Sequence, residues 1–221
     1  MTALAQIRTR PAGHCGASLK LRVRCDLLET VPHVTELDGS RPRRHKISLH
    51  IGEVAASKSP VVLHTLLGSC VAVCLYDPFL HAGGMNHILL ARCRAGEKSP
   101  RCGIHAMELL INELMKLGGD RRRFVAKAFG GATVLGGIAM PAVGKENAEF
   151  VRNFLAAEKI PLVAERMGGT HAVHLYFRID TGKVTVHTVD GSVLPKIIDS
   201  EQSYRSQASG SQPFAGEITL F

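Results

Sequence analysis

Cys70 and His87 are the two residues whose types and setting most favour covalent chemistry. Cys70 follows Gly68-Ser69 between two apolar, strand-like runs, so we expect it on a tight turn at the end of a strand. Backbone amides around such a turn can point at a developing oxyanion. A thiol needs a base at neutral pH, and His87 follows after one hairpin-like excursion. In such a dyad the thiolate attacks a carbonyl, the imidazolium protonates the leaving group, and the imidazole then activates water against the thioester.

Spacing alone does not separate this chemistry from ordinary packing. A cysteine in a Gly-Ser turn is commonly a buried hydrophobe, and eleven histidines offer many accidental partners. The remaining cysteines form no Cys-x-x-Cys pair and have no zinc-like spacing, so we expect reduced thiols, no metal and no cofactor. They are Cys15, Cys25, Cys74, Cys93 and Cys102.

The elements that must position these residues predict the α+β class. Apolar residues at three- and four-residue steps predict helices over 104–117 and 147–157. Strand-like runs occupy 47–51, 61–67, 71–76, 83–90, 123–129, 161–165, 174–179 and 183–189, with a hairpin turn at Asp180-Thr181-Gly182. Short turns between so many strands favour a layered sandwich of mostly antiparallel or mixed β-sheet with two main helices.

Charge is unevenly distributed along the 221 residues, whose formal net charge is +8. Residues 1–46 carry nine basic and four acidic side chains, so we expect a flexible basic extension ahead of a domain at 47–196. The Ser- and Gln-rich residues 197–221 predict a disordered tail. A nearly neutral domain without Trp argues against nucleic-acid binding, and any polyanion binding would belong to the extension.

Membrane insertion is not expected either. No run approaches about 18 consecutive apolar residues, and the N-terminus lacks the apolar stretch of a signal peptide. We therefore expect a soluble, cytoplasmic protein.

Five separated segments carry a resemblance to a known family. They are Leu67 to Pro78, Gly83 to Leu90, Ala126 to Ala132, the Gly144 to Asn147 turn and the Gly168-Gly169 pair. In this order, over residues 47–195, they resemble the chemoreceptor glutamine deamidase family, CheD. No phosphate-binding pattern accompanies the Gly130-Gly131 pair, so we expect it to permit close packing near the site.

The resemblance implies an enzyme, a protein-glutamine deamidase. Its substrates would be selected glutamines of methyl-accepting chemoreceptors, hydrolysed to glutamate with release of ammonia, which tunes chemotaxis signalling. Cys70 matches the nucleophile and His87 the general base, with Gly68 and Ser69 in the turn expected to form the oxyanion site. A threonine before the cysteine completes the family's triad.

Two departures from the family pattern leave alternatives open. The family commonly has its threonine six residues before the cysteine, where this chain has His64, whereas Thr65 is five before. Neighbouring residues of a strand face opposite ways, so we predict Thr65 as the third catalytic residue while His64 remains the alternative. After Gly168-Gly169 this chain departs again, with Thr170 and Val173 where the family has Asn and Arg.

The rival function is a catalytically weakened module that binds receptors or a CheC-type phosphatase.

Overall fold

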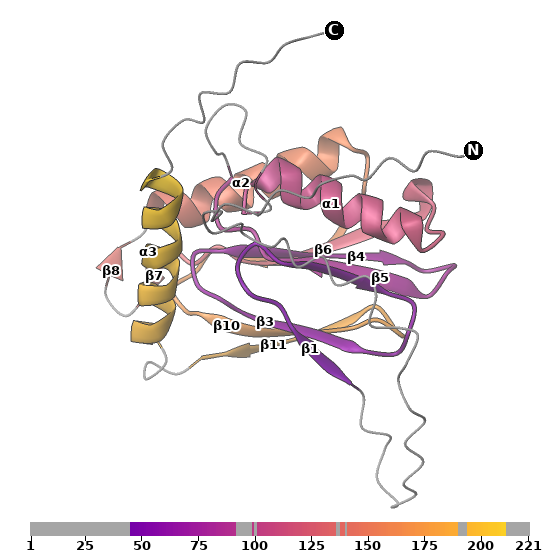
Figure 1. Ribbon diagram of the computed structural model, residues 1–221, viewed down its shortest axis with the longest axis horizontal. Helices are drawn as coiled ribbons and strands as arrows, with labels where there is room; N and C mark the ends of the chain where they lie inside the picture. The colour runs from indigo at the N-terminus through magenta and orange to yellow at the C-terminus, as the bar shows by residue number, and fades with distance from the viewer. Residues whose placement is uncertain are drawn as a thin grey trace, which may run out of the picture.

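Two β-sheets and a pair of helices stack as three layers in this computed structural model, which describes residues 45–91, 99, 101–135, 138–139, 141–189 and 194–210 (Figure 1). The five-stranded sheet has the order β2-β5-β4-β6-β9, and the four-stranded sheet has the order β1-β3-β10-β11. Helices α1 (Gly103–Lys116) and α2 (Pro141–Ala157) cover the outer face of the five-stranded sheet (Figure 1).

The strand bounds follow the apolar runs of the sequence. They are β1 (Lys46–Ser48), β2 (Val54–Ser57), β3 (Val62–Leu67), β4 (Val71–Asp77), β5 (Ala82–Asn86), β6 (Val125–Gly130), β7 (Val134–Leu135), β8 (Ile138–Ala139), β9 (Leu162–Met167), β10 (Val173–Arg178) and β11 (Lys183–Thr188). Most neighbouring strands pair antiparallel, whereas β1 with β3 and β6 with β9 pair parallel. The predicted α+β sandwich of mixed sheets is confirmed.

Central strand β4 explains why the layers form. Its side chains alternate between the two faces, and both faces are covered. Val71, Val73 and Leu75 pack against the helices, whereas Ala72 and Cys74 pack toward the four-stranded sheet. The five-stranded sheet is therefore the middle layer, with one apolar core on each side.

The two predicted helices are present, with different starting points. Helix α1 buries the middle of the expected three- and four-step stripe but leaves its two ends, Ile104 and Met115, exposed. Helix α2 begins at Pro141 rather than at 147. Proline fits the first turn of a helix because its missing N–H would be unpaired there in any case. Strands β2, β7 and β8 were not predicted. Strand β5 ends at Asn86, so His87 lies just beyond the strand rather than inside it. The hairpin at 180–182 is confirmed, with Gly182 at a φ of 64°.

A third helix, α3 (Leu194–Gly210), corrects the prediction of a disordered tail from residue 197. It stands across one end of both sheets (Figure 1). Ile197 and Ile198 anchor it in a small apolar cluster with Ala132, Ala172 and Val189. These two isoleucines supply the burial that the Ser- and Gln-rich composition obscured. Residues 211–221 and residues 1–44 of the predicted extension at 1–46 lie outside the described residues.

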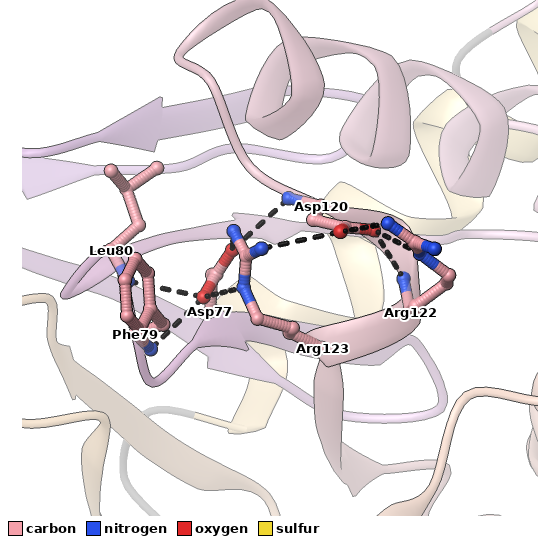
Figure 2. Close-up of polar contacts among 6 residues, drawn as sticks. All are labelled: Asp77, Phe79, Leu80, Asp120, Arg122 and Arg123. Atoms are coloured by element: carbon pink, nitrogen blue, oxygen red, sulfur yellow. Dashed lines mark hydrogen bonds and ion pairs between the residues drawn. The ribbon is translucent and has the colours of Figure 1, made fainter.

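An ion pair between buried Asp77 and partly exposed Arg123 ties the end of β4 to the short 3-10 helix η1 (Arg121–Arg123), as Figure 2 shows. The Asp77 carboxylate is fully buried and accepts hydrogen bonds from the Arg123 guanidinium at 2.7 and 3.1 Å. Backbone N–H groups of Phe79, Leu80 and Asp120 also donate to it. Burial would raise the pKa of Asp77, but these hydrogen bonds outweigh burial and lower it to about 2.

Three further observations bear on the sequence predictions. None of the helices in the described part of the chain combines the length and apolar character needed to cross a membrane. Within the same residues, no group of three His, Cys, Asp or Glu side chains is arranged to hold a metal ion. Cys70 and Cys74 are reduced, as predicted, but Cys102 is disulfide-bonded, so the prediction of reduced thiols is wrong there.

Candidate active site

The turn between β3 and β4 places Cys70 immediately before β4, buried between the two sheets. Its carbonyl accepts a hydrogen bond from the backbone of Gly131 at 2.7 Å, and the Gly68 carbonyl accepts one from Ala132 at 2.9 Å. Gly130 has a φ of 106°, and a Cβ there would lie 2.3 Å from the Cys70 carbonyl oxygen. The Gly130-Gly131 pair therefore permits close packing against the cysteine turn, as predicted.

Strand pairing brings His87 to the same face as Cys70. Val71 and Ile88 form an antiparallel bridge with N–H···O distances of 3.0 and 2.8 Å. Continuing that register sets Leu89 opposite Cys70 and makes His87 its diagonal neighbour, because side-chain direction repeats every two residues. Cys70 and Leu89 both belong to the core between the sheets. The structure thus brings the two predicted catalytic side chains to one side of the sheet.

Thr65 of β3 fixes the tautomer of His87. The Thr65 hydroxyl donates to the Leu49 carbonyl at 2.7 Å and lies 2.8 Å from Nδ1 of His87. Because a hydroxyl has only one proton to donate, Nδ1–H must be the donor in the second hydrogen bond. The neutral imidazole therefore carries its proton on Nδ1 and its lone pair on Nε2.

His64 faces the other way, as strand alternation requires. It is half-buried and stacks on Tyr176 of β10, with ring centroids 5.7 Å apart. Burial, followed by Lys46 and two neighbouring histidines, lowers its pKa. Of the two alternatives that the sequence left open, Thr65 is the residue that contacts His87.

The surroundings of His87 keep its ring neutral at pH 7. The ring is 3% exposed, and burial lowers the pKa of His87 to about 4. Its Nε2 is buried without a hydrogen-bond partner among the residues that the structure describes. At neutral pH this nitrogen is therefore an unprotonated acceptor, and none of those residues competes for its lone pair.

The turn predicted to form the oxyanion site contacts a carboxyl side chain. The Ser69 hydroxyl donates to one carboxylate oxygen of Glu201, on α3, and the backbone N–H of Cys70 donates to the other at 3.3 Å. Both donors thus point at side-chain oxygens beside Cys70. No sequence signal identified Glu201, which lies 131 residues from Cys70 in a segment expected to be disordered.

Asn147 of α2 is a second residue that the site predictions missed. Its fully buried amide Nδ2 donates to the Ser69 carbonyl at 3.1 Å and to the Leu89 carbonyl at 3.0 Å. It thereby joins the turn that carries Cys70 to the segment that carries His87. The segment 144–147 contributed to the family resemblance, but no spacing rule identified this role.

A cavity of about 300 Å³ opens beside His87, although Cys70 is not among the residues that line it. Thr65, His87 and Leu49 line it, and α3 contributes Ser200 and Glu201. A small side-chain group can therefore reach the imidazole. The Cys74 thiol, by contrast, is buried in the core farther along β4, where burial raises its pKa and keeps it protonated.

Comparisons with known proteins identify relatives over most of the chain. Residues 91–188 match the family model described as CheD chemotactic sensory transduction, a range that begins after Cys70 and His87. A protein of Stenotrophomonas maltophilia (strain K279a), named probable chemoreceptor glutamine deamidase CheD, is 47% identical over 160 residues, covering 72% of this chain and 80% of that protein. A protein of the same name from Xanthomonas euvesicatoria pv. vesicatoria is 46% identical over the same shares of each chain.

One relative of lower identity and one solved structure also match parts of this chain. A Shewanella oneidensis protein, named probable chemoreceptor glutamine deamidase CheD 1, is 40% identical and covers 80% of this chain and 88% of that protein. The crystal structure of Bacillus licheniformis hypothetical protein YfiH matches 56% of this chain and 58% of that one, with 15% identity and a TM-score of 0.33. That structural likeness is too slight to inform the fold.

Proposed function

Because the chain belongs to the CheD family, we propose that it hydrolyses selected glutamine side chains of chemoreceptors to glutamate, with release of ammonia. Its relatives are named for this activity. The observation that carries the proposal is the Thr65–His87 hydrogen bond, which leaves a buried Nε2 lone pair on the sheet face shared with Cys70. A carboxamide is a poor electrophile, so its hydrolysis needs such a base beside a nucleophile.

In the first half of the reaction, Nε2 of His87 takes the thiol proton of Cys70, and the sulfur attacks the side-chain carbonyl carbon of glutamine. The backbone N–H of Cys70 stabilises the oxyanion that forms. The imidazolium then gives its proton to the amide nitrogen, the C–N bond breaks, and ammonia leaves a thioester. Since the pKa of His87 is about 4, the imidazolium readily gives up this proton.

In the second half, Nε2 takes a proton from water, whose oxygen attacks the thioester carbon. The C–S bond breaks, and the imidazolium returns its proton to the sulfur. One water is consumed and one ammonia is released, and the receptor side chain becomes a glutamate. Thr65 acts by holding the imidazole in the Nδ1–H tautomer throughout.

The test is ammonia release from a chemoreceptor fragment, with mass spectrometry of the receptor peptides. Cys70→Ala should reduce deamidation by at least about 10³-fold, because the nucleophile is lost. Cys74→Ala is the matched control, since it removes a buried thiol from the same strand and should leave turnover in place. Undiminished activity in Cys70→Ala would overturn the mechanism.

The same assay separates the rival function of a binding module. If the wild-type chain binds the receptor fragment but leaves every glutamine unchanged, the protein is a module rather than an enzyme. A CheC-type phosphatase partner and a cytoplasmic location stay predictions.

A further inference from the structure

The candidate active site already contains a glutamate side chain. Glu201 is 2% exposed, and its carboxylate accepts hydrogen bonds from the Ser69 hydroxyl and the Cys70 backbone N–H. It lines the same cavity as His87 and Thr65. A side-chain carboxylate of glutamate is the product group of glutamine hydrolysis, so Glu201 presents that group at the proposed oxyanion site.

The two carboxylate oxygens match the two positions that a glutamine amide requires. Oε1 receives the Cys70 N–H, which is where the carbonyl oxygen must lie to become an oxyanion. Oε2 lies at the Ser69 hydroxyl. In a bound glutamine substrate, the amide nitrogen would take the position of this second oxygen. Because a hydroxyl can both accept and donate, Ser69 can accept from an amide NH₂ before the reaction and donate to a carboxylate after it.

Helix α3 presents Glu201 in a way that a separate helix could copy. Ile197 and Ile198 pack on the end of the domain, while Arg101 lies over the ring of Tyr204 at 4.8 Å from its centroid. Between these two anchors, Glu201 projects from the helix into the cavity. A receptor glutamine on a helix would have to approach by the same route.

Given the proposed function, we propose that α3 is an internal product mimic that occupies the substrate site. Glu201 stands where the reacting glutamine side chain binds, and a receptor helix must displace α3 before it can react. The chain is therefore self-inhibited, and its apparent affinity for receptor is reduced by the fraction of molecules in which α3 is seated.

Glu201→Gln in the full chain tests the position of this side chain directly. The variant replaces one carboxylate oxygen by an amide nitrogen, and it turns the product mimic into an internal substrate. We expect the introduced glutamine to be hydrolysed back to glutamate with uptake of one water and release of one ammonia. Peptide mass spectrometry detects the change as a mass gain of about 1 Da, the difference between OH and NH₂ on the hydrolysed amide.

The tryptic peptide that follows Lys196 contains its own control. Gln202 lies beside position 201 on the same helix but is exposed, so it should remain glutamine. The double variant Cys70→Ala/Glu201→Gln should retain both glutamines. If the introduced glutamine persists in a preparation that still deamidates a receptor fragment, the assignment of Glu201 to the product position is overturned. If the receptor fragment is not deamidated either, the proposed function has failed and the inference falls with it.

Self-inhibition has a separate kinetic readout. Glu201→Ala removes the two hydrogen bonds that seat α3, so the KM for the receptor fragment should fall by about tenfold while kcat changes little. Gln202→Ala, on the exposed side of α3, should leave both constants unchanged. An unchanged KM in Glu201→Ala would contradict self-inhibition.

Discussion

Thr65 accepts a hydrogen bond from Nδ1 of His87 while its own proton is given to the Leu49 carbonyl. With both hydrogen bonds made in these directions, the neutral ring of His87 can have only one tautomer. Thr65→Val keeps the shape of the side chain but removes the acceptor, so the ring can rotate or carry its proton on Nε2. We expect kcat for deamidation to fall by about 10²-fold, with KM little changed, because the base would be lost while the substrate contacts remain.

The matched comparisons for this variant are two threonine substitutions. Thr65→Ser restores a hydroxyl and should recover most of kcat. Thr185→Val, at an exposed position of β11, should behave as wild type in the same assay. Full activity in Thr65→Val would show that the ring needs no acceptor behind it.

The sequence could predict the parts of the site that depend on local pattern. Period-two alternation identifies the face of β4 that carries Cys70, and the opposite facing of His64 and Thr65 follows from the same rule. To decide whether His64 or Thr65 contacts His87, one must know how β3 is aligned with the segments that carry Leu49 and His87. That register depends on pairing between distant strands, which a single sequence does not specify.

Glu201 and Asn147 could not be predicted for a different reason. Each reaches the Ser69-Cys70 turn from a helix far along the chain. Glu201 belongs to no motif, and the segment that carries Asn147 gave no indication of its contact with this turn. For α3 the composition was misleading, since two isoleucines provide the apolar anchor of an otherwise polar segment. A short apolar pair in a polar context resembles a disordered tail until its partners on other elements are known.

The pH dependence of kcat/KM should report the burial of His87. This ratio follows ionisations of the free enzyme, and the base must be unprotonated to act. Because burial lowers the pKa of His87 to about 4, activity should persist well below pH 6.5 and fall only as the pH drops through about 4. A pH series of ammonia release, limited to the range where circular dichroism reports a folded chain, measures this. An acid limb near pH 6.5 would contradict a desolvated base.

Asp77 should matter for stability rather than for catalysis. Asp77→Asn removes a buried carboxylate from the Arg123 guanidinium, so we expect unfolding to cost about 2–3 kcal/mol less, measured by urea denaturation at pH 7. The pKa of Asp77 is lowered to about 2 in the folded chain, so its stabilising contribution is complete above about pH 4 and is lost as the pH falls toward 2. Asp120→Asn, at a more exposed carboxylate in the same network, should have the smaller effect. Equal losses in the two variants would contradict the central role of Asp77.

Asn147 should position the two halves of the site without contacting the substrate itself. Its amide holds the carbonyl of Ser69, which precedes Cys70, and the carbonyl of Leu89, which lies opposite Cys70 on the neighbouring segment. Asn147→Ala leaves both carbonyls without this donor and lets the Cys70 turn shift against His87. Displacement of reacting groups by even about 1 Å can cost 10²-fold, so we expect kcat to fall by about 10- to 100-fold.

A purely structural role would predict a different pattern, which separates the two explanations. If Asn147 only stabilises the fold, the surviving folded fraction of Asn147→Ala should turn over at the wild-type rate once active sites are counted by titration of the Cys70 thiol. If it positions the site, kcat per active site falls while the acid limb of the pH profile stays near 4, because the burial of His87 is unchanged. Asn153→Ala, at an exposed position of the same helix, is the control and should match wild type in both measurements.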